Sequence, residues 1–566
     1  MTDSSAKTSP WWRGPFLVRH QPLVLLLVVA GALRAVVWLS LPPATWFSGD
    51  SFSYVTAAVR PEPGLWRPSG YSLLLLLPLR PAHSLALVTA VQHLLGLGVG
   101  VAVYVLLLRY RVPRWAGTLA VVPVLLDAYL VSTEQMLLSE ALFIPLVVLA
   151  LALLLWKPVG PGVVLASVGG LLLGLAAVTR SVGLALVVVA AVLLLVRRAG
   201  LARVAALLVA AALPVGVYAA WYHHDYRRWG TSASGGLFLY GRVSQFVDCG
   251  RLNGLDPVVR ALCPAESVGS RRSESYYVFS PLSPAQRVAG PMTNRNELAG
   301  RFARQAVLNQ PGDYLSECWH ALVTLFSASD DTTADRYLLR AQAAVPRSDL
   351  PTIHGYDHGS VDTRPDPRGV DALLAYQWVA RVPGLACLLA LLVAGAGAAF
   401  GRDTDGRGMR GAILALAGSA AVLYLVPVMT VGPDVRYRFP TVPLLAAAGC
   451  LGLALLVGRV VSVRWRRVAV AHRPGLVRPA AAGVDPTGLE VTRPDLSPLE
   501  AAGPDGAAPG AVESETPGPP ARSSHAHDQH GADQQGADRR GEVPHRERQR
   551  GDDPDDGKPG AGNTAT

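Results

Sequence analysis

Long apolar stretches alternate with short polar connections along this chain, from residue 22 to residue 462. Apolar runs of about 20 residues match the hydrocarbon thickness of a bilayer, where a helix satisfies its own backbone hydrogen bonds. The pattern therefore predicts an all-α polytopic membrane protein with about ten transmembrane helices. The expected spans are residues 22–42, 84–108, 114–131, 138–156, 161–179, 182–196, 202–222, 377–400, 411–431 and 441–462.

Basic residues mark one side of the membrane. Lys or Arg occurs in the connections 109–113, 157–160, 197–201 and 401–410, and the last span runs into Arg464. Cytoplasmic loops carry an excess of Lys and Arg, so we expect these connections and both termini to be cytoplasmic. The sequence thus predicts a multi-pass protein of the cell membrane.

The spans divide the chain into five regions. We expect the tail to be disordered, because it is rich in Pro, Gly, Asp and Arg and has too few large apolar residues to form a core. The long outer segment is expected to be a partly helical cap with a helix break at Pro311. The regions are a cytoplasmic N-terminus (1–21), an N-terminal transmembrane module (22–222) with a first outer loop (43–83), the cap (223–376), C-terminal transmembrane helices (377–465) and the cytoplasmic tail (466–566).

Composition excludes several classes of protein. The chain is 51% hydrophobic and 16% charged, whereas soluble proteins carry about 25% charged residues. This composition and the clustering of the apolar residues exclude a soluble enzyme. The net charge of +10 comes from arginines beside the spans, without a basic, aromatic-interleaved patch, so no nucleic-acid partner is expected. The five cysteines form no CxxC pattern, and Cys249 and Cys263 share the cap, where either a disulfide or free thiols remain open.

Ionisable residues at the outer ends of the spans carry the functional signal, because a charge beside hydrocarbon is costly and needs a partner or a ligand. Asp50, in WFSGDSFSY, follows the first span. It fits either the cap of a short helix or a carboxylate acting as a general base. Glu134 fits the first turn of a helix, whereas Glu140, in LLSEALF, lies at the membrane boundary and needs a polar partner or a cavity.

Arginines on the outer side form the second group. Arg180, in AAVTRSVGL, is read either as an interfacial side chain that reaches water or as an anion ligand. VGPDVRYRFP is read either as an Asp–Arg pair that braces the loop or as a phosphate site in which Arg436 and Arg438 each make two hydrogen bonds. Arg67, in WRPSGYSLL, and Arg60 are further candidates. Acids and arginines on one side suit a lipid-linked phosphate that enters from the bilayer.

These motifs resemble the GT-C superfamily of polytopic glycosyltransferases, most closely the branch of protein O-mannosyltransferases and aminoarabinose lipid A transferases. The similar pieces are GDSFSY, RPSGYSLLL, LLSEALF, GLAAVTRSVGL and RYRFPTVPLLA, in this order within residues 15–465. The resemblance implies a GT-C-like fold, a polyprenyl-phosphate sugar donor, inverting transfer and an extracytoplasmic active site. The acceptor would be a cell-wall glycan, a lipid or a protein.

Carried onto this sequence, the resemblance makes Asp50 the catalytic carboxylate, in preference to a helix cap. It makes Glu140, and after it Glu134, the second acidic residue of the site. Relatives often carry adjacent acids in the first loop, whereas here Ser51 follows Asp50. No His/Asp cluster marks a metal site, so dependence on a divalent metal stays open. The residues expected to bind the donor phosphate are Arg180, Arg436, Arg438 and Arg67.

Two other classes remain as alternatives. A lipid or solute transporter or flippase also has charges within its spans and Gly-rich helices, but the sequence shows no inverted repeat. A non-catalytic scaffold would use the tail to recruit partners. The sequence selects neither the sugar nor the acceptor, although mannose and arabinose carriers suit a cell wall.

Overall fold

The computed structural model describes residues 18–47, 49–157, 160–252, 254, 256–327, 345–401 and 408–471, with side chains in the last helix up to residue 458. All of them lie in the first of two compact units, residues 1–477 and 478–566. Most of the expected N-terminus (1–17) and tail (472–566) lies outside the described residues. Within the described ranges the protein is helical, with one isolated β-bridge between Thr45 and Met136 and no strand.

Every predicted span coincides with an apolar helix or with a bent pair of helices. Among the described residues, five helices are long and apolar enough to cross a membrane, and two bent pairs raise that number to seven. Three expected spans correspond to the shorter apolar helices α8, α9 and α10. The helices are α2 (Gln21–Ser40), α5 (Leu85–Arg109), α6 (Arg114–Leu126), α7 (Ala128–Gln135), α8 (Glu140–Leu154), α9 (Val163–Thr179), α10 (Gly183–Val196), α11 (Leu201–Tyr226), α20 (Pro367–Val379), α21 (Gly384–Phe400), α22 (Met409–Thr430) and α23 (Val442–Ala471).

The two bent pairs are joined to each other at Asp127. The α6–α7 pair bends by 49° and the α20–α21 pair by 42°. The carboxylate of Asp127 accepts hydrogen bonds from the backbone N–H of Leu130 (2.8 Å) and of Val382 (2.7 Å). The N–H of Ala128 donates to the carbonyl of Ala380 (2.7 Å). Each break therefore satisfies backbone groups that the other leaves open, which a membrane interior requires.

Small residues let the apolar helices approach closely. A Cβ atom on Gly170 of α9 would lie 2.2 Å from the carbonyl oxygen of Leu207 on α11, and one on Gly174 would lie 2.4 Å from that of Ala211. Such close contacts between backbones are typical of membrane helices, whose association depends on van der Waals packing. Only glycine fits at these two positions of α9.

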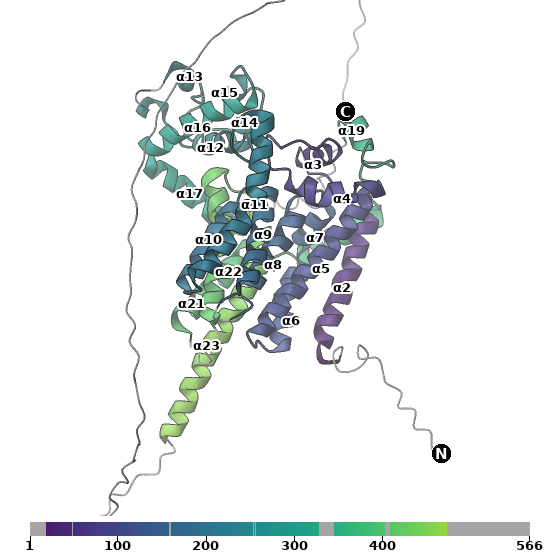
Figure 1. Ribbon diagram of the computed structural model, residues 1–566, viewed down its shortest axis with the longest axis vertical. Coiled ribbons are helices and arrows are strands. Elements are labelled where there is room, and N and C mark those ends of the chain that lie inside the picture. Colours follow the sequence, from purple (N-terminus) through teal and green to yellow (C-terminus); the bar gives the residue numbers. More distant parts are fainter. Residues whose placement is uncertain are drawn as a thin grey trace, which may run out of the picture. The chain divides into compact units, whose positions relative to one another are not determined.

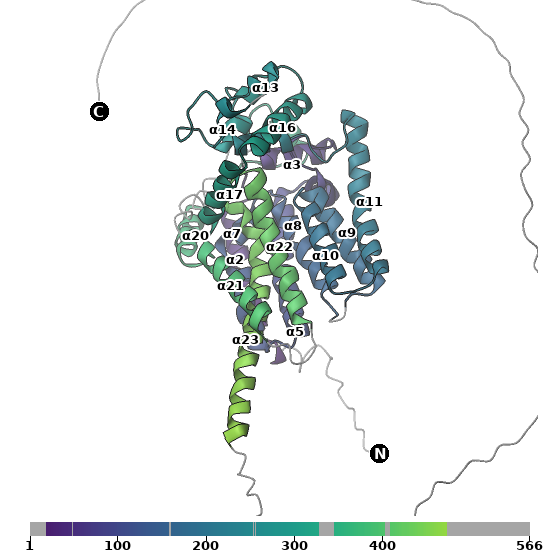
Figure 2. The same ribbon diagram turned by 90° about the vertical axis from the view of Figure 1, so that its left-hand side faces the viewer.

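The cap lies at one end of the helix bundle, together with α3 and α19, whereas α23 extends from the opposite end (Figure 1). The view turned by 90° shows the same arrangement (Figure 2). The predicted break near Pro311 is confirmed, because α16 ends at Asn309 and α17 begins at Pro311. The remaining described elements are α3 (Asp50–Val59), a π-helix (Ser72–Leu76), α4 (Leu77–Leu79), α12 (Gly235–Val243), α13 (Pro257–Arg260), α14 (Glu274–Phe279), α15 (Pro284–Arg287), α16 (Met292–Asn309), α17 (Pro311–Phe326), α19 (Leu350–His354) and four 3₁₀ turns (Arg80–Ala82, Cys249–Arg251, Val435–Tyr437, Phe439–Thr441).

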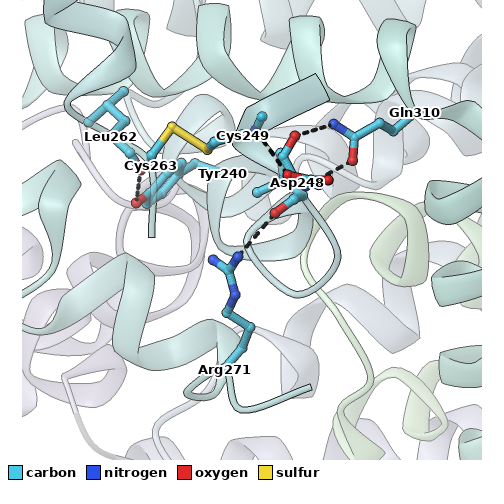
Figure 3. Close-up of a disulfide and its surroundings, with 9 residues drawn as sticks. Tyr240, Asp248, Cys249, Leu262, Cys263, Arg271 and Gln310 are labelled. Atoms are coloured by element: carbon cyan, nitrogen blue, oxygen red, sulfur yellow. Dashed lines mark hydrogen bonds between the residues drawn. A yellow bond between two sulfur atoms is a disulfide. The ribbon is translucent and has the colours of Figure 1, made fainter. Parts of the chain in front are cut away.

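A disulfide joins Cys249 to Cys263 in the cap, which answers the question left open by the sequence (Figure 3). Beside it, the Tyr240 hydroxyl donates to the carbonyl of Leu262 (2.8 Å). The amide side chain of Gln310 makes two hydrogen bonds of 2.9 Å with the backbone of the residue that precedes Cys249. The bridge thus closes the loop that contains α13, and Tyr240 and Gln310 fasten this loop to the helices of the cap.

Replacing both bridged cysteines by serine is expected to loosen the cap. The bridge spans a sequence separation of 14, and closing a loop of that size stabilises a fold by about 3 kcal/mol. Hydrogen exchange of the full-length protein in nanodiscs should show faster exchange in α12–α17 and unchanged exchange in α5 and α8. Cys450→Ala, which removes a free thiol, is the control. Equal cap protection in the double variant and the wild type would contradict this expectation.

Candidate active site

Five charged side chains meet at the cap end of the bundle. They come from segments that are far apart in the sequence: the first residue of α3, the loop after α3, the first residue of α8, the residue after α9 and the loop between α22 and α23. Gly49, whose φ is 63°, precedes the first of these residues and lets the chain turn into α3. We call these side chains the charged cluster: Asp50, Arg67, Glu140, Arg180 and Arg436.

Arg436 connects the two carboxylates of the charged cluster. Its Nη1 donates to Asp50 Oδ2 (3.0 Å), and its Nε and Nη2 lie 2.9 and 2.6 Å from Glu140 Oε1. The guanidinium also stacks over the ring of Phe47, with 4.2 Å to the ring centroid. Asp50, Glu140 and Arg436 are 4%, 0% and 7% exposed, so water screens these contacts very little.

The other two arginines complete the ion pairs. Arg67 donates to the second carboxylate oxygen of Asp50, and Arg180 Nη1 lies 2.5 Å from Glu140 Oε1. On the far side of Glu140, the Ser139 hydroxyl donates to Oε2 (3.2 Å) and accepts from the Tyr54 hydroxyl (3.0 Å). Both oxygens of each carboxylate therefore have hydrogen-bond partners.

The charged cluster has more positive than negative charge. Three guanidinium groups face two carboxylates, which leaves one excess positive charge in a largely buried place. Burial, followed by the charges of Arg436 and Arg180, lowers the pKa of Arg67 to about 9. Arg67 remains protonated at neutral pH, and an anion placed beside these three groups would relieve their mutual repulsion.

A cavity of about 1120 Å³ opens beside the charged cluster. Asp50, Arg67 and Arg436 contribute to its wall, whereas Glu140 and Arg180 lie behind that wall. Arg60, which the sequence also indicated, lines the cavity without being part of the cluster. The remaining walls come from the first outer loop, from α12 and α14 of the cap, and from the turn after α22.

Glu134 occupies a different place from the charged cluster. Its carboxylate receives two hydrogen bonds of 2.8 Å from Arg34 of α2 and lies 2.9 Å from Nδ1 of His93 on α5. The sequence reasoning missed Arg34 and His93, which lie inside apolar spans. Both are ionisable residues in apolar stretches, which is the signal that would have found them.

Arg438 also points away from the charged cluster. It is 1% exposed, and its guanidinium donates to the backbone carbonyls of Leu325 (3.0 Å) and Val382 (3.5 Å). It thereby ties the end of α17 and the break before α21 to the loop that carries Arg436. Of the seven site residues predicted from the sequence, five meet, while Glu134 and Arg438 hold neighbouring elements together.

The described residues include no group of three or more His, Cys, Asp or Glu side chains placed to hold a metal ion. The charged cluster itself offers two carboxylates, and each already accepts hydrogen bonds from arginine. What the cluster can hold is an anion with several oxygen atoms, because planar guanidinium groups match phosphate oxygens in pairs.

No protein-family model and no curated protein matches this sequence. Solved structures similar to the chain include the S. cerevisiae protein O-mannosyltransferase Pmt1-Pmt2 complex bound to the sugar donor (14% identity, TM-score 0.32, covering 44% of this chain and 37% of that one). The archaeal oligosaccharyltransferase AglB from Archaeoglobus fulgidus, in complex with an inhibitory peptide and a dolichol-phosphate, is another (14%, 0.38, 82% and 53%). A third is ArnT from Cupriavidus metallidurans in the apo state (16%, 0.30, 81% and 82%).

This chain thus spans about half or less of the first two of these chains. Protein O-mannosyltransferases, which the sequence resemblance also names, are represented among the similar structures. At 16% identity or less, the function proposed below rests on the residues of the charged cluster and on the sequence motifs.

Arg436→Ala is expected to lower the free energy of unfolding by about 3–5 kcal/mol, because it leaves two buried carboxylates with one arginine each. Thermal unfolding of the purified protein in detergent measures the change. Arg60→Ala, at an exposed position of the same cavity, is the control and should have little effect. Adding Glu140→Gln to Arg436→Ala should restore part of the loss, and strictly additive losses would contradict the ion-pair account.

Gly96 and Gly98 on α5 form a matched pair for testing the packing around Glu134. A Cβ atom on Gly96 would lie 1.8 Å from Glu134 Oε1, whereas one on Gly98 would meet nothing within 4 Å. Gly96→Ala should therefore destabilise the protein by about 1–3 kcal/mol through overpacking, and Gly98→Ala should be neutral or stabilise it by up to about 1 kcal/mol. Equal melting temperatures of the two variants would show that Glu134 is not held in this place.

Proposed function

We propose that this protein is a membrane glycosyltransferase that moves a sugar from a polyprenyl-phosphate donor to an acceptor outside the cytoplasm. The observation that carries the proposal is the charged cluster of three arginines and two carboxylates, of which Asp50, Arg67 and Arg436 line a cavity of about 1120 Å³ at the end of a bundle of apolar helices. An anion-binding site beside a carboxylate, at the edge of a membrane, suits a lipid-linked sugar phosphate.

The basic turns at the other end of the bundle support an orientation of the protein in the membrane with the cap outside the cytoplasm. Glu140, a member of the charged cluster, is the first residue of α8. Trp156 and Lys157 follow the other end of this helix. The carbonyl of Trp156 accepts from Arg109 (2.8 Å), and that of Lys157 accepts from Arg197 (3.2 Å). Lys and Arg prefer the cytoplasmic side, so the cap and the charged cluster face away from the cytoplasm, where the disulfide is also stable.

In the donor complex, the phosphate takes the place that the carboxylate of Asp50 now occupies beside the arginines. Arg67, Arg180 and Arg436 hold its oxygen atoms and neutralise the charge that develops as the phosphate leaves. Glu140 keeps Arg180 and Arg436 in position through the contacts of 2.5 and 2.6 Å. Glu134 and Arg438 support this arrangement from behind by joining the helices that carry it.

Asp50 acts as the general base. In the unloaded protein its two oxygens accept from Arg67 and Arg436, so both oxygens are occupied. When the donor phosphate draws these guanidinium groups away, a carboxylate oxygen becomes free to accept the proton of an acceptor hydroxyl. The acceptor oxygen then bonds to the sugar C1 while the bond from C1 to the phosphate oxygen breaks, which inverts the configuration at C1, and the polyprenyl phosphate leaves with the electron pair.

The test is sugar transfer by the full-length protein in nanodiscs from a panel of polyprenyl-phosphate sugars, comparing the wild type with Asp50→Asn. Turnover should fall by about 10²–10⁴-fold. Donor binding should be retained or tightened, because one negative charge beside the arginines is gone. Asp225→Asn, at the exposed end of α11, is the matched control and should retain full activity.

Two outcomes of this test would contradict the proposal at different levels. Equal turnover by Asp50→Asn and the wild type would assign the base to another residue, with Glu140→Gln as the next variant. A wild-type protein that neither binds nor uses any donor of the panel, with acceptors present, would contradict the glycosyltransferase proposal itself and favour a transporter.

A further inference from the structure

Three aromatic rings form one wall of the cavity beside the charged cluster. Trp66 belongs to the first outer loop, Phe238 to α12 and Phe279 to α14, and all three line the cavity. The Trp66 and Phe279 ring centroids are 5.0 Å apart, and Phe238 lies 6.4 Å from Trp66 and 6.0 Å from Phe279. Phe279 remains 47% exposed. The cap and the first loop thus present an aromatic surface to the cavity.

The backbone holds this aromatic wall next to Asp50. Trp66 directly precedes Arg67, whose guanidinium donates to Asp50. The carbonyl of Trp66 accepts from the Ser234 hydroxyl (2.7 Å). The carbonyl of Leu65 accepts from the backbone N–H of Ala233 (2.6 Å). A molecule that stacks on Trp66 therefore lies in the same cavity as the carboxylate of Asp50.

The remaining charges of the cavity wall are mainly acidic. Outside the charged cluster, the described residues of the wall include four carboxylates, those of Glu62, Glu274, Asp349 and Asp434, and one guanidinium, that of Arg60. This part of the cavity repels anionic groups, whereas carboxylate oxygens accept hydrogen bonds from hydroxyl groups. The arginines of the charged cluster and these carboxylates with the aromatic wall therefore suit two different ligands.

We propose that the aromatic wall is the acceptor subsite, and that it binds a neutral, hydroxyl-rich sugar chain. This inference rests on the proposed function and names the acceptor of the same site. The apolar C–H face of a sugar ring packs on Trp66 and Phe279, because aromatic faces are negatively polarised. The sugar hydroxyls donate to Glu62, Glu274 and Asp349, and one hydroxyl lies beside Asp50.

The position and the size of the cavity favour a glycan over a lipid acceptor. The aromatic wall is built by α12 and α14 of the cap and by the outer loop, at the end of the bundle (Figure 1), so an acceptor reaches it from the aqueous side. Sites for one small molecule have volumes of about 300–1,000 Å³, and the cavity of about 1120 Å³ accommodates several sugar rings beside a donor sugar.

The first test is equilibrium binding to the full-length protein in nanodiscs, without a donor. The probes are neutral glucan, mannan, galactan and arabinan oligosaccharides, a uronic-acid oligosaccharide of the same length, and a Ser/Thr-rich peptide. At least one neutral oligosaccharide should bind more tightly than the uronic-acid oligosaccharide and the peptide. Trp66→Leu and Phe279→Leu should each weaken that binding by about tenfold, whereas Trp319→Leu, at a position 62% exposed and outside the cavity, should not.

The second test is transfer from a polyprenyl-phosphate sugar to the same probes. Trp66→Leu should raise the KM for the neutral acceptor by about tenfold and leave the KM for the donor unchanged. Glu62→Gln combined with Asp349→Asn should raise transfer to the uronic-acid oligosaccharide relative to transfer to the neutral one. A merely structural role of Trp66 would instead lower kcat and donor binding together.

The two tests separate this inference from the proposed function. Donor use with transfer to the peptide only, or binding that Trp66→Leu and Trp319→Leu change equally, would overturn the acceptor subsite and leave the glycosyltransferase standing. Oligosaccharide binding that depends on Trp66, together with no use of any donor, would support the subsite and overturn the transferase.

Discussion

The guanidinium of Arg436 contacts two buried carboxylates at once, 3.0 Å from Asp50 and 2.6 Å from Glu140, and the cap end of the bundle is arranged around this double contact. Removing a charge from water costs several kcal/mol, which an ion pair recovers only with close geometry and further hydrogen bonds. The start of α3, the start of α8 and the loop between α22 and α23 are therefore held in one relative position. That position leaves an excess positive charge beside an open cavity.

The same constraint shapes the interior of the bundle. Glu134 accepts two hydrogen bonds from Arg34, and Asp127 accepts backbone hydrogen bonds at the break of one bent helix pair and from the other. Polar groups within an apolar bundle need partners, since neither lipid nor packed side chains can supply hydrogen bonds. These contacts join α2, α5, α7 and α21 and give the charged cluster a fixed support. A site that must hold a phosphate within tenths of an ångström benefits from such support.

Much of this could be predicted from the sequence, because apolar length and charge position are local properties. The ten apolar segments and the position of Asp50, Glu140, Arg180 and Arg436 at the ends of these segments are visible in the residues alone. Which charges pair with which is decided by packing between distant segments. The sequence therefore predicts Glu134 as a residue of the active site, although its partner is Arg34 in α2, and it gives no sign of the break at Asp127.

The disulfide and the aromatic wall show the same limit. The spacing of Cys249 and Cys263 permits a bridge without requiring one, and only the folded cap brings the two sulfur atoms together. Trp66 and Phe279 are 213 positions apart in the numbering, so no local pattern predicts that their rings meet. The proposed acceptor subsite depends on such long-range contacts, whereas the acids and arginines of the site follow the ends of the apolar segments and can be found from the sequence.

The most direct measurement of the central claim is a structure of the full-length protein in nanodiscs with bound polyprenyl phosphate. The account predicts phosphate oxygens within about 2.7–3.2 Å of guanidinium nitrogens of Arg67, Arg180 and Arg436, with the contact between Arg67 and Asp50 broken. Phosphate bound elsewhere, with the contacts from Arg436 to Asp50 and Glu140 unchanged, would contradict it.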